Sequence, residues 1–98
     1  MPAYLALHKH RKEAAQTINQ LPEKLEHAKQ LAHSMDCDVE YYLTNGQYDS
    51  AVIVTAPDEK TAKQLALGVT SEGTVTAEFQ RAFHESEVGE LVEGIPEP

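Results

Sequence analysis

Two apolar runs separated by a polar segment constrain the fold more than any other feature of this chain. The runs are residues 39–44 (VEYYLT) and 51–55 (AVIVT), and the segment between them contains Asn-Gly, which is typical of hairpin turns. The second run is apolar at successive positions, whereas a strand with one face in water alternates apolar and polar side chains. Both faces of this strand should therefore be covered. A chain of 98 residues is too short to cover a sheet twice, so we expect a second subunit on one face.

The residues before these runs predict a strand followed by a long helical region. Residues 3–7 (AYLAL) form a short apolar run before the charged Lys9, which favours a buried strand. From Lys12 onward, apolar residues recur every three or four positions, which is the period of an amphipathic helix. These residues are Ile18, Leu21, Leu25, Ala28, Ala32 and Met35. Because Pro22 would remove a helical hydrogen bond and clash with the preceding turn, we expect two helical pieces that meet near residues 19–21, the second with Pro22 in its first turn.

A further helix is expected after residues 51–55. Asp58 is a candidate N-cap, and Glu59 places negative charge in the first turn, where the helix dipole favours it. The helix should end near residues 71–73, which include a glycine able to take a left-handed conformation. Its apolar face is formed by Ala62, Leu65, Ala66 and Val69.

The chain closes with a fourth strand and a short helix. Residues 74–83 alternate well enough for a strand, with one face formed by Val75, Ala77 and Phe79. Residues 85–92 predict a short helix, which His84 could cap. The complete order is β-α-β-β-α-β, which predicts an α+β fold of ferredoxin-like topology, with a four-stranded antiparallel sheet and both long helices on one face.

This topology leaves the other face of the sheet without helices. Residues 3–7 and 51–55 become the central strands, which fits their continuous apolar character. The uncovered face carries either Ala51 and Ile53 or Val52 and Val54, depending on the register. Because an apolar patch of that kind is typical of an interface, we predict a homodimer through this open face.

The length and composition of the chain indicate one domain. We expect a single domain over residues 1–98, with a short C-terminal helix and tail from about residue 84. No apolar run approaches the roughly 20 residues of a transmembrane helix, and residues 1–4 lack the features of a signal peptide, so the expected location is the cytoplasm, with no membrane partner. A formal charge of −8 argues against nucleic acid as a partner, since phosphate binding needs a clustered basic surface.

The single cysteine, Cys37, is predicted to be structural or exposed rather than nucleophilic. One cysteine cannot form a disulfide within the chain. The neighbouring carboxylates of Asp36 and Asp38 disfavour the thiolate and should therefore raise the pKa of the thiol.

Residues 46–49 (GQYD) resemble the Gly-x-Tyr-Asp motif after which the GYD domain family is named. The resemblance covers nearly the whole chain, and it includes Met1-Pro2-Ala3-Tyr4, Ile18, Pro22, Ala56-Pro57-Asp58 and Gly73-x-Val75. It implies a dimeric ferredoxin-like α/β barrel whose biochemical role is largely undefined. The chain departs from the family pattern at Lys9 and Arg11, where Asn and Thr are expected, and at residues 36–37, where a Gly-Gly pair often precedes the second strand.

Tyr48 and Asp49 lie where the hairpin enters the strand at residues 51–55, and two interpretations are open. In the structural one, Gly46 permits the turn, Tyr48 packs over the sheet edge and Asp49 accepts hydrogen bonds from backbone amides. In the functional one, Asp49 is a general base or ligand anchor at the mouth of a cleft, with Tyr48 as a donor. Turn chemistry alone accounts for these residue types and favours the structural interpretation.

His8 and His10 are two residues apart, so in an extended segment both rings point to the same side. They could share a metal ion or a proton of a substrate. A zinc site needs a third and usually a fourth ligand, however, and neither Cys37 nor another histidine lies close in the sequence. We therefore predict no metal site and no cofactor.

The tyrosines are candidates for the walls of a ligand pocket. Tyr41 and Tyr42 are adjacent in one strand, so one should face the helices and the other the dimer side or solvent. Aromatic rings with a polar tip suit a ligand cleft, although the same residues are ordinary in cores and interfaces. The candidate ligand-binding residues are Tyr4, Tyr41, Tyr42 and Tyr48.

Three functions are compatible with these residues. The leading hypothesis is a small homodimeric ligand-binding or accessory protein, with a cleft between sheet and helices or at the dimer seam. The second, suggested by the resemblance, is a cofactor-independent enzyme of the monooxygenase or isomerase type, with His8, Tyr48 and Asp49 as candidate catalytic residues. The third is a structural or adaptor protein that acts through its acidic C-terminal helix.

Overall fold

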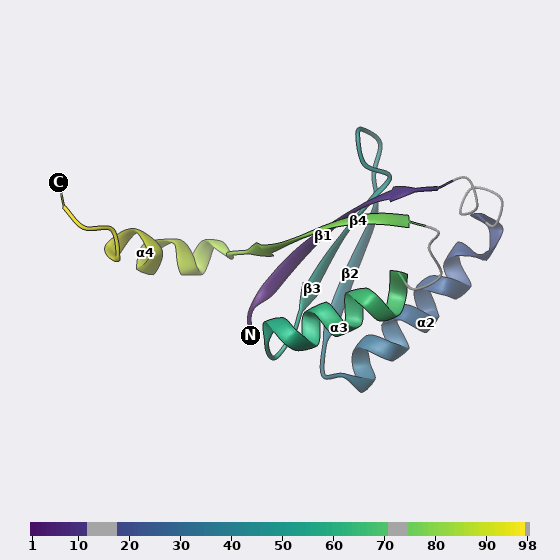
Figure 1. The fold of residues 1–98 in the computed structure, drawn as a ribbon, viewed down its shortest axis with the longest axis horizontal. Helices are drawn as coiled ribbons and strands as arrows, with labels where there is room; N and C mark the ends of the chain where they lie inside the picture. Colours follow the sequence, from purple (N-terminus) through teal and green to yellow (C-terminus); the bar gives the residue numbers. More distant parts are fainter. Residues whose placement is uncertain (12–17, 71–74, 98) are drawn as a thin grey trace.

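The computed structural model describes residues 1–11, 18–70 and 75–97 (Figure 1). The elements are β1 (Ala3–His10), the 3-10 helix η1 (Ile18–Gln20), α2 (Leu21–Ser34), β2 (Asp38–Leu43), β3 (Ser50–Thr55), α3 (Glu59–Thr70), β4 (Val75–Ala82) and α4 (Glu85–Glu93). This confirms the predicted βαββαβ order. The expected helix from Lys12 to Thr17 and the expected end of α3 at residues 71–73 lie outside the described residues.

The four strands form one antiparallel sheet in the order β2-β3-β1-β4, so β1 and β3 are central as predicted. β1 is longer than the sequence indicated, because it continues through Lys9 to His10 while still paired with β4. The charge of Lys9 does not end the strand, because this side chain is exposed to solvent and the backbone stays paired with Thr76 of β4. The Lys9 ammonium group lies 5.5 Å from the centre of the Tyr48 ring, a cation–π arrangement. Long-range strand pairing therefore overrides the local signal.

The start and the end of α2 follow from local chemistry. The helix begins at Leu21 directly after the 3-10 turn and has Pro22 in its first turn, as predicted. It ends in a Schellman motif, in which the amide of Cys37 donates to Ala32 O at 2.9 Å and the amide of Asp36 donates to His33 O at 3.1 Å. Asp36 has a φ of 58°, the left-handed conformation that such a motif requires. This is the place where the family pattern often has glycine.

α3 begins at the predicted cap. The amide of Thr61 donates to Asp58 Oδ1 at 2.7 Å, and this hydrogen bond holds the pKa of Asp58 below its ordinary value. Along the helix, Ala62 and Leu65 are 0% and 1% exposed and form part of the core. The predicted apolar face of α3 therefore does face the sheet.

The core lies between the sheet and the two helices α2 and α3. The register places Val52 and Val54 on this side, where they are 7% and 6% exposed, and leaves Ile53 on the other side at 37%. The ring of Tyr4 stacks on Phe79 of β4 with centroids 5.4 Å apart. The register question that the sequence left open is thereby answered, because Val52 and Val54 face the helices.

The opposite face of the sheet is open within this chain. Its centre is apolar, because Leu5 pairs with Ile53 and Leu7 pairs with Ala51 across the two central strands. These four residues, Leu5, Leu7, Ala51 and Ile53, are called the open-face strip below. On the edge strands the strip is flanked by polar residues, including Glu78.

Cys37 is buried, with 4% of its surface exposed. Burial, followed by the carboxylates of Asp36 and Asp38, raises the pKa of the thiol. The predicted direction is confirmed, but desolvation is the larger cause. The residue is therefore a small apolar core residue rather than a nucleophile.

Candidate functional site

A cavity of about 150 Å³ lies between the sheet and the helix pair. Its wall is largely apolar and includes Leu25 of α2, Val52 of β3 and Leu65 of α3. Room for it arises where small residues face one another, since Ala6 of β1 and Ala28 of α2 both line it. The same packing that makes the core therefore leaves space inside it.

Tyr41 of β2 contributes the most unusual polar group of the cavity wall. Its hydroxyl is buried, and none of the described residues gives it a hydrogen-bond partner. Leaving a buried donor unpaired costs about 1–3 kcal/mol, so such groups are rare and need an explanation. The adjacent Tyr42 points to the other face and is 54% exposed, as the alternation of a strand requires.

Two further polar residues, His8 and Ser50, line the cavity where β1 and β3 pair. Ser50 is completely buried, and its Oγ lies 3.4 Å from Nε2 of His10. Burial, followed by the charge of His10, lowers the pKa of His8. His8 is therefore mainly neutral at pH 7, with one ring nitrogen able to donate and the other able to accept a hydrogen bond.

The paired histidines do not assemble a metal centre with other residues. His8 and His10 both belong to β1, as the pairing argument required. Across residues 1–11, 18–70 and 75–97, however, no three or more histidine, cysteine or acidic side chains are grouped so that they could hold a metal ion. The polar side chains that line the cavity are those of His8, Tyr41 and Ser50, together with Lys24 and Lys29 of α2.

Tyr48 lies on the open side of the sheet rather than in the cavity. Its hydroxyl donates to Glu78 of β4 at 2.5 Å, and the ammonium group of Lys9 lies over its ring. The hydrogen bond to Glu78 is the main cause that raises the pKa of the Tyr48 phenol. The phenol therefore stays protonated near neutral pH, with its proton already engaged.

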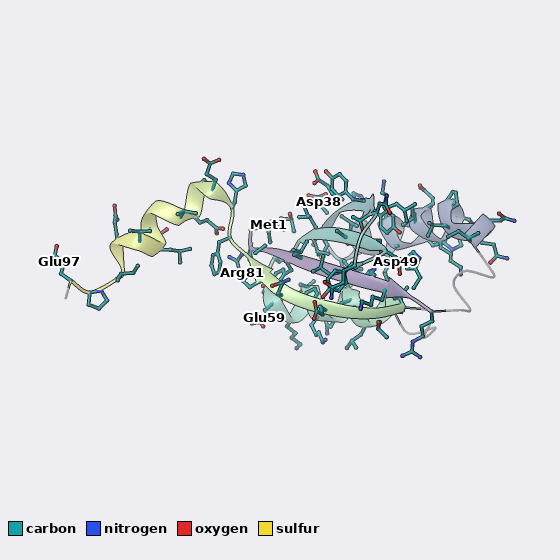
Figure 2. The ribbon with its side chains drawn as sticks, turned by 90° about the horizontal axis from the view of Figure 1, so that it is seen from above. Met1, Asp38, Asp49, Glu59, Arg81 and Glu97 are labelled. Carbon is teal, nitrogen blue, oxygen red and sulfur yellow. The ribbon has the colours of Figure 1, made fainter. Side chains whose placement is uncertain are left out.

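Asp49 lies beside the C-terminal end of β1 and hydrogen-bonds to the backbone there (Figure 2). Its Oδ2 accepts from the amide of His10 at 2.8 Å, and its own amide donates to His8 O at 2.8 Å. The predicted bonding of Asp49 to backbone amides is thus confirmed. The expectation for Gly46 is wrong, because its φ lies outside the left-handed range, so the turn does not depend on glycine there.

The structure thus separates the candidate residues into four places. The cavity brings together His8 and Tyr41, Tyr4 is buried in the core, Tyr42 and Tyr48 lie on the open face, and Asp49 lies at the end of β1. Sequence reasoning missed Ser50, whose position at the end of the second apolar run gave no sign of complete burial. It also missed the alanines that make room for the cavity, although their places in the predicted apolar faces were the available signal.

The fold and the cavity define an α+β domain with a helix-covered antiparallel sheet. Residues 4–92 match the family model of the GYD domain, so the chain belongs to the GYD domain family. No curated protein matches the chain. Within the described residues, no helix combines the length and apolar character needed to cross a membrane.

Two solved structures are similar to this chain at low sequence identity. A C-terminal segment of the alpha subunit of aIF2 from Pyrococcus abyssi is similar with a TM-score of 0.52 and 18% identity, over 86% of this chain and 51% of that one. The chain thus spans about half the length of that segment. The de novo designed protein Foldit4 is similar with a TM-score of 0.47 and 18% identity, over 86% of this chain and 97% of the designed one. At such identities the first likeness concerns the fold alone.

Proposed function

We propose that this protein binds a small, largely apolar molecule with one polar group in the cavity between the sheet and the helices. The observation that carries the proposal is the buried Tyr41 hydroxyl, which has no partner among the described residues. A ligand that accepts a hydrogen bond from Tyr41 would relieve the cost of that unpaired donor. Ligand binding would therefore stabilise the folded protein by giving the Tyr41 hydroxyl a hydrogen-bond partner.

The size of the cavity restricts the ligand. Its volume is about 150 Å³. An apolar protein cavity of about this volume is known to accept benzene, so a molecule with one ring or a short branched chain is the expected size. The apolar wall favours such a molecule, since most of its surface would leave water.

The polar residues restrict the chemistry of the ligand. Tyr41 supplies a donor, and the neutral ring of His8 supplies one donor and one acceptor. A hydroxyl or carbonyl group on an apolar body can hydrogen-bond to both groups, and Lys24 and Lys29 of α2 also line the cavity. A phenol is the simplest molecule with this combination and is therefore the natural probe.

The placement of the candidate catalytic residues supports binding over catalysis by that set. His8 lines the cavity, whereas the phenol of Tyr48 is bonded to Glu78 and the carboxylate of Asp49 is bonded to the amide of His10. A general base must lie within hydrogen-bond reach of the proton that it removes. His8 would have to act there without Tyr48 and Asp49.

The test compares phenol with benzene on two proteins, the natural chain and Tyr41→Phe. Replacement by phenylalanine keeps the ring and removes the hydroxyl. We expect the natural chain to bind phenol about 2- to 12-fold more tightly than benzene, the equivalent of one net hydrogen bond of about 0.5–1.5 kcal/mol, and Tyr41→Phe to lose this preference. Dissociation constants from NMR titration provide the measurement.

A cavity-filling variant serves as the control for this titration. Ala28→Phe should fill the space between α2 and the sheet and abolish binding of both probes. Binding that persists in Ala28→Phe, or no binding of either probe to the natural chain at millimolar concentration, would contradict the proposal. Circular dichroism and thermal unfolding establish that each variant is folded.

The proposal includes a homodimer formed through the open face, with two sheets packed as a dimeric α/β barrel. Its support is the open-face strip, with Ile53 at 37% exposure in the middle of a sheet. Native mass spectrometry reports the number of subunits and any retained small molecule together. A chain that remains monomeric at 100-fold its working concentration would rule out this assembly without affecting the cavity.

A further inference from the structure

α4 stands away from the rest of the molecule. In Figures 1 and 2 it lies beyond the end of the sheet, joined to the body through the end of β4. The molecule measures 54 × 31 × 18 Å, and its radius of gyration of 15.3 Å exceeds the roughly 13 Å of a compact domain of this length. The helix is therefore an arm rather than part of the core.

The joint between β4 and α4 is well defined. The guanidinium of Arg81 lies 3.4 Å from Glu87 Oε1 and 4.3 Å from the centre of the Phe83 ring. His84 caps the helix, since its Nδ1 accepts from the amide of Ser86 at 3.0 Å while Glu87 accepts from the amide of His84 at 2.8 Å. The direction in which the arm leaves the body is thus set by named contacts.

The arm carries an apolar stripe along one side. Its members follow the spacing i, i+3, i+4 and i+7, the pattern by which a helix docks on a protein surface. They are Val88, Leu91 and Val92 of α4 and Ile95 directly after its C-cap Gly94, with exposures of 46%, 47%, 58% and 66%. They are called the arm stripe below. A helix of nine residues is marginal in water on its own, so the stripe must be covered for the arm to persist.

We infer that α4 is an exchange arm whose stripe packs against a second copy of this chain. This inference rests on the homodimer of the proposed function and adds a second contact to it. Exchange is reciprocal, because in a two-fold pair each copy gives one arm and receives one. The open-face strip and the arm stripe would then be covered by the same partner.

The negative charge of the arm restricts which partners it can bind. From residue 84 to residue 98 the chain has five glutamates and neither lysine nor arginine. Such a segment is repelled by anionic membranes and by nucleic acids, which attract basic helices. Glu90 and Glu93 lie on the side of the helix away from the stripe, so they can stay in water when the stripe docks on a protein.

The surface area that the interface would bury favours a second copy that contacts the arm as well as the sheet. Four strands with about six paired residues each cover roughly 400 Å², given strand spacings near 4.8 Å and a rise near 3.3 Å per residue. A stable interface buries about 800 Å² on each partner. One nine-residue helix face adds roughly 130 Å², and exchange adds it twice to each copy, once as the arm given and once as the surface that receives the partner's arm. The sheet and the exchanged arms together cover roughly 660 Å² on each copy, which is closer to that size than the sheet alone.

The test uses two variants, each with one new negative charge on a different side of the arm. Leu91→Glu puts it in the arm stripe, and Gly89→Glu puts the same charge on the opposite flank, where an added Cβ meets no atom within 4 Å. We expect Leu91→Glu to raise the dimer dissociation constant at least 10-fold and Gly89→Glu to change it less than 2-fold. Sedimentation equilibrium of the full chain measures both constants, and thermal unfolding checks that the body stays intact.

A photoactivatable benzophenone residue in place of Val92 locates the surface that receives the arm. We expect a cross-linked species of twice the mass, with the attachment point on the second copy. A dimer that Leu91→Glu leaves intact and Ile53→Lys abolishes would overturn the exchange arm and keep the open-face dimer. A natural chain that is monomeric would overturn both, and phenol binding would still report on the cavity independently.

Discussion

The two faces of the sheet are built from the same strands but have different surroundings. Along β1, Tyr4 and Ala6 point to the helices and are 3% and 5% exposed, while Leu5 and Leu7 point to the open face and stay partly exposed. The covered face encloses a cavity lined by apolar residues and a few polar ones, and the open face carries an apolar strip. A strand that is apolar on both sides therefore needs two covers, of which this chain supplies one. This difference between the faces is the reason for the homodimer that we propose.

The largest difference between the faces should appear in the stability of the monomer. Leu65 lies on the covered side at 1% exposure, so Leu65→Ala removes buried methyl groups and should lower the free energy of unfolding by about 2–5 kcal/mol. Ile53→Ala on the open face should cost clearly less at protein concentrations below the dimer dissociation constant. Urea denaturation of both variants tests this, and equal losses would remove the distinction between the faces.

The open face should instead matter for association. Ile53→Lys places a charge in the centre of the open-face strip, where a second sheet would have to desolvate it. We expect at least a 10-fold rise in the dimer dissociation constant with a change in monomer stability of at most about 1 kcal/mol. Light scattering over a range of concentrations measures the association, and Leu67→Lys, on an exposed position of α3, serves as the matched control.

Substitutions in the connection from α2 to β2 measure the backbone strain at Asp36. Asp36 holds a φ of 58°, which costs an L-residue about 1–2 kcal/mol and glycine almost nothing. Asp36→Gly should therefore raise the free energy of unfolding by about 1 kcal/mol, and Asp38→Gly, in an extended strand, should lower it. Thermal and urea unfolding of the two variants provide the measurement, and destabilisation by Asp36→Gly would contradict the Schellman account.

The smallest expected effect is a pH dependence of stability on the covered face. Burial lowers the pKa of His8 below its ordinary value of 6.5, so below pH 6.5 the unfolded chain binds more protons at this position than the folded one. This contribution to stability is present above pH 6.5 and is lost as the pH falls from there toward the folded-state pKa. His8→Gln should reduce the loss between pH 7.5 and 5.5, whereas the exposed His33→Gln should leave it unchanged.

Much of the fold is predictable because its signals are local. Pro22 and Asp58 mark helix starts through their own backbone chemistry, and the structure has both starts where these residues predict them. The end of β1 was predicted too early because pairing with β4, distant in sequence, continues through Lys9, whose charged side chain stays in solvent. The register of β3 was open because its two candidate faces are equally apolar in sequence.

The site is less predictable because it depends on contacts between distant elements. His8 and Tyr41 were candidates, but their shared cavity exists because α2 and β1 present small residues to one another. The position of Tyr48 depends on Glu78, thirty residues away in the chain. Likewise, the period of α4 predicts a helix but does not show that the helix leaves the body.

We propose that the covered face binds a small ligand and that the open face binds a second subunit. The most direct test is a phenol titration followed by NMR of the methyl groups. We expect chemical-shift changes at Val52, Val54 and Leu65, which line the cavity, and none at Leu5 and Ile53 of the open-face strip. Shifts confined to the open-face strip, with the cavity methyl groups unchanged at saturating phenol, would contradict the division of the sheet into a ligand face and an assembly face.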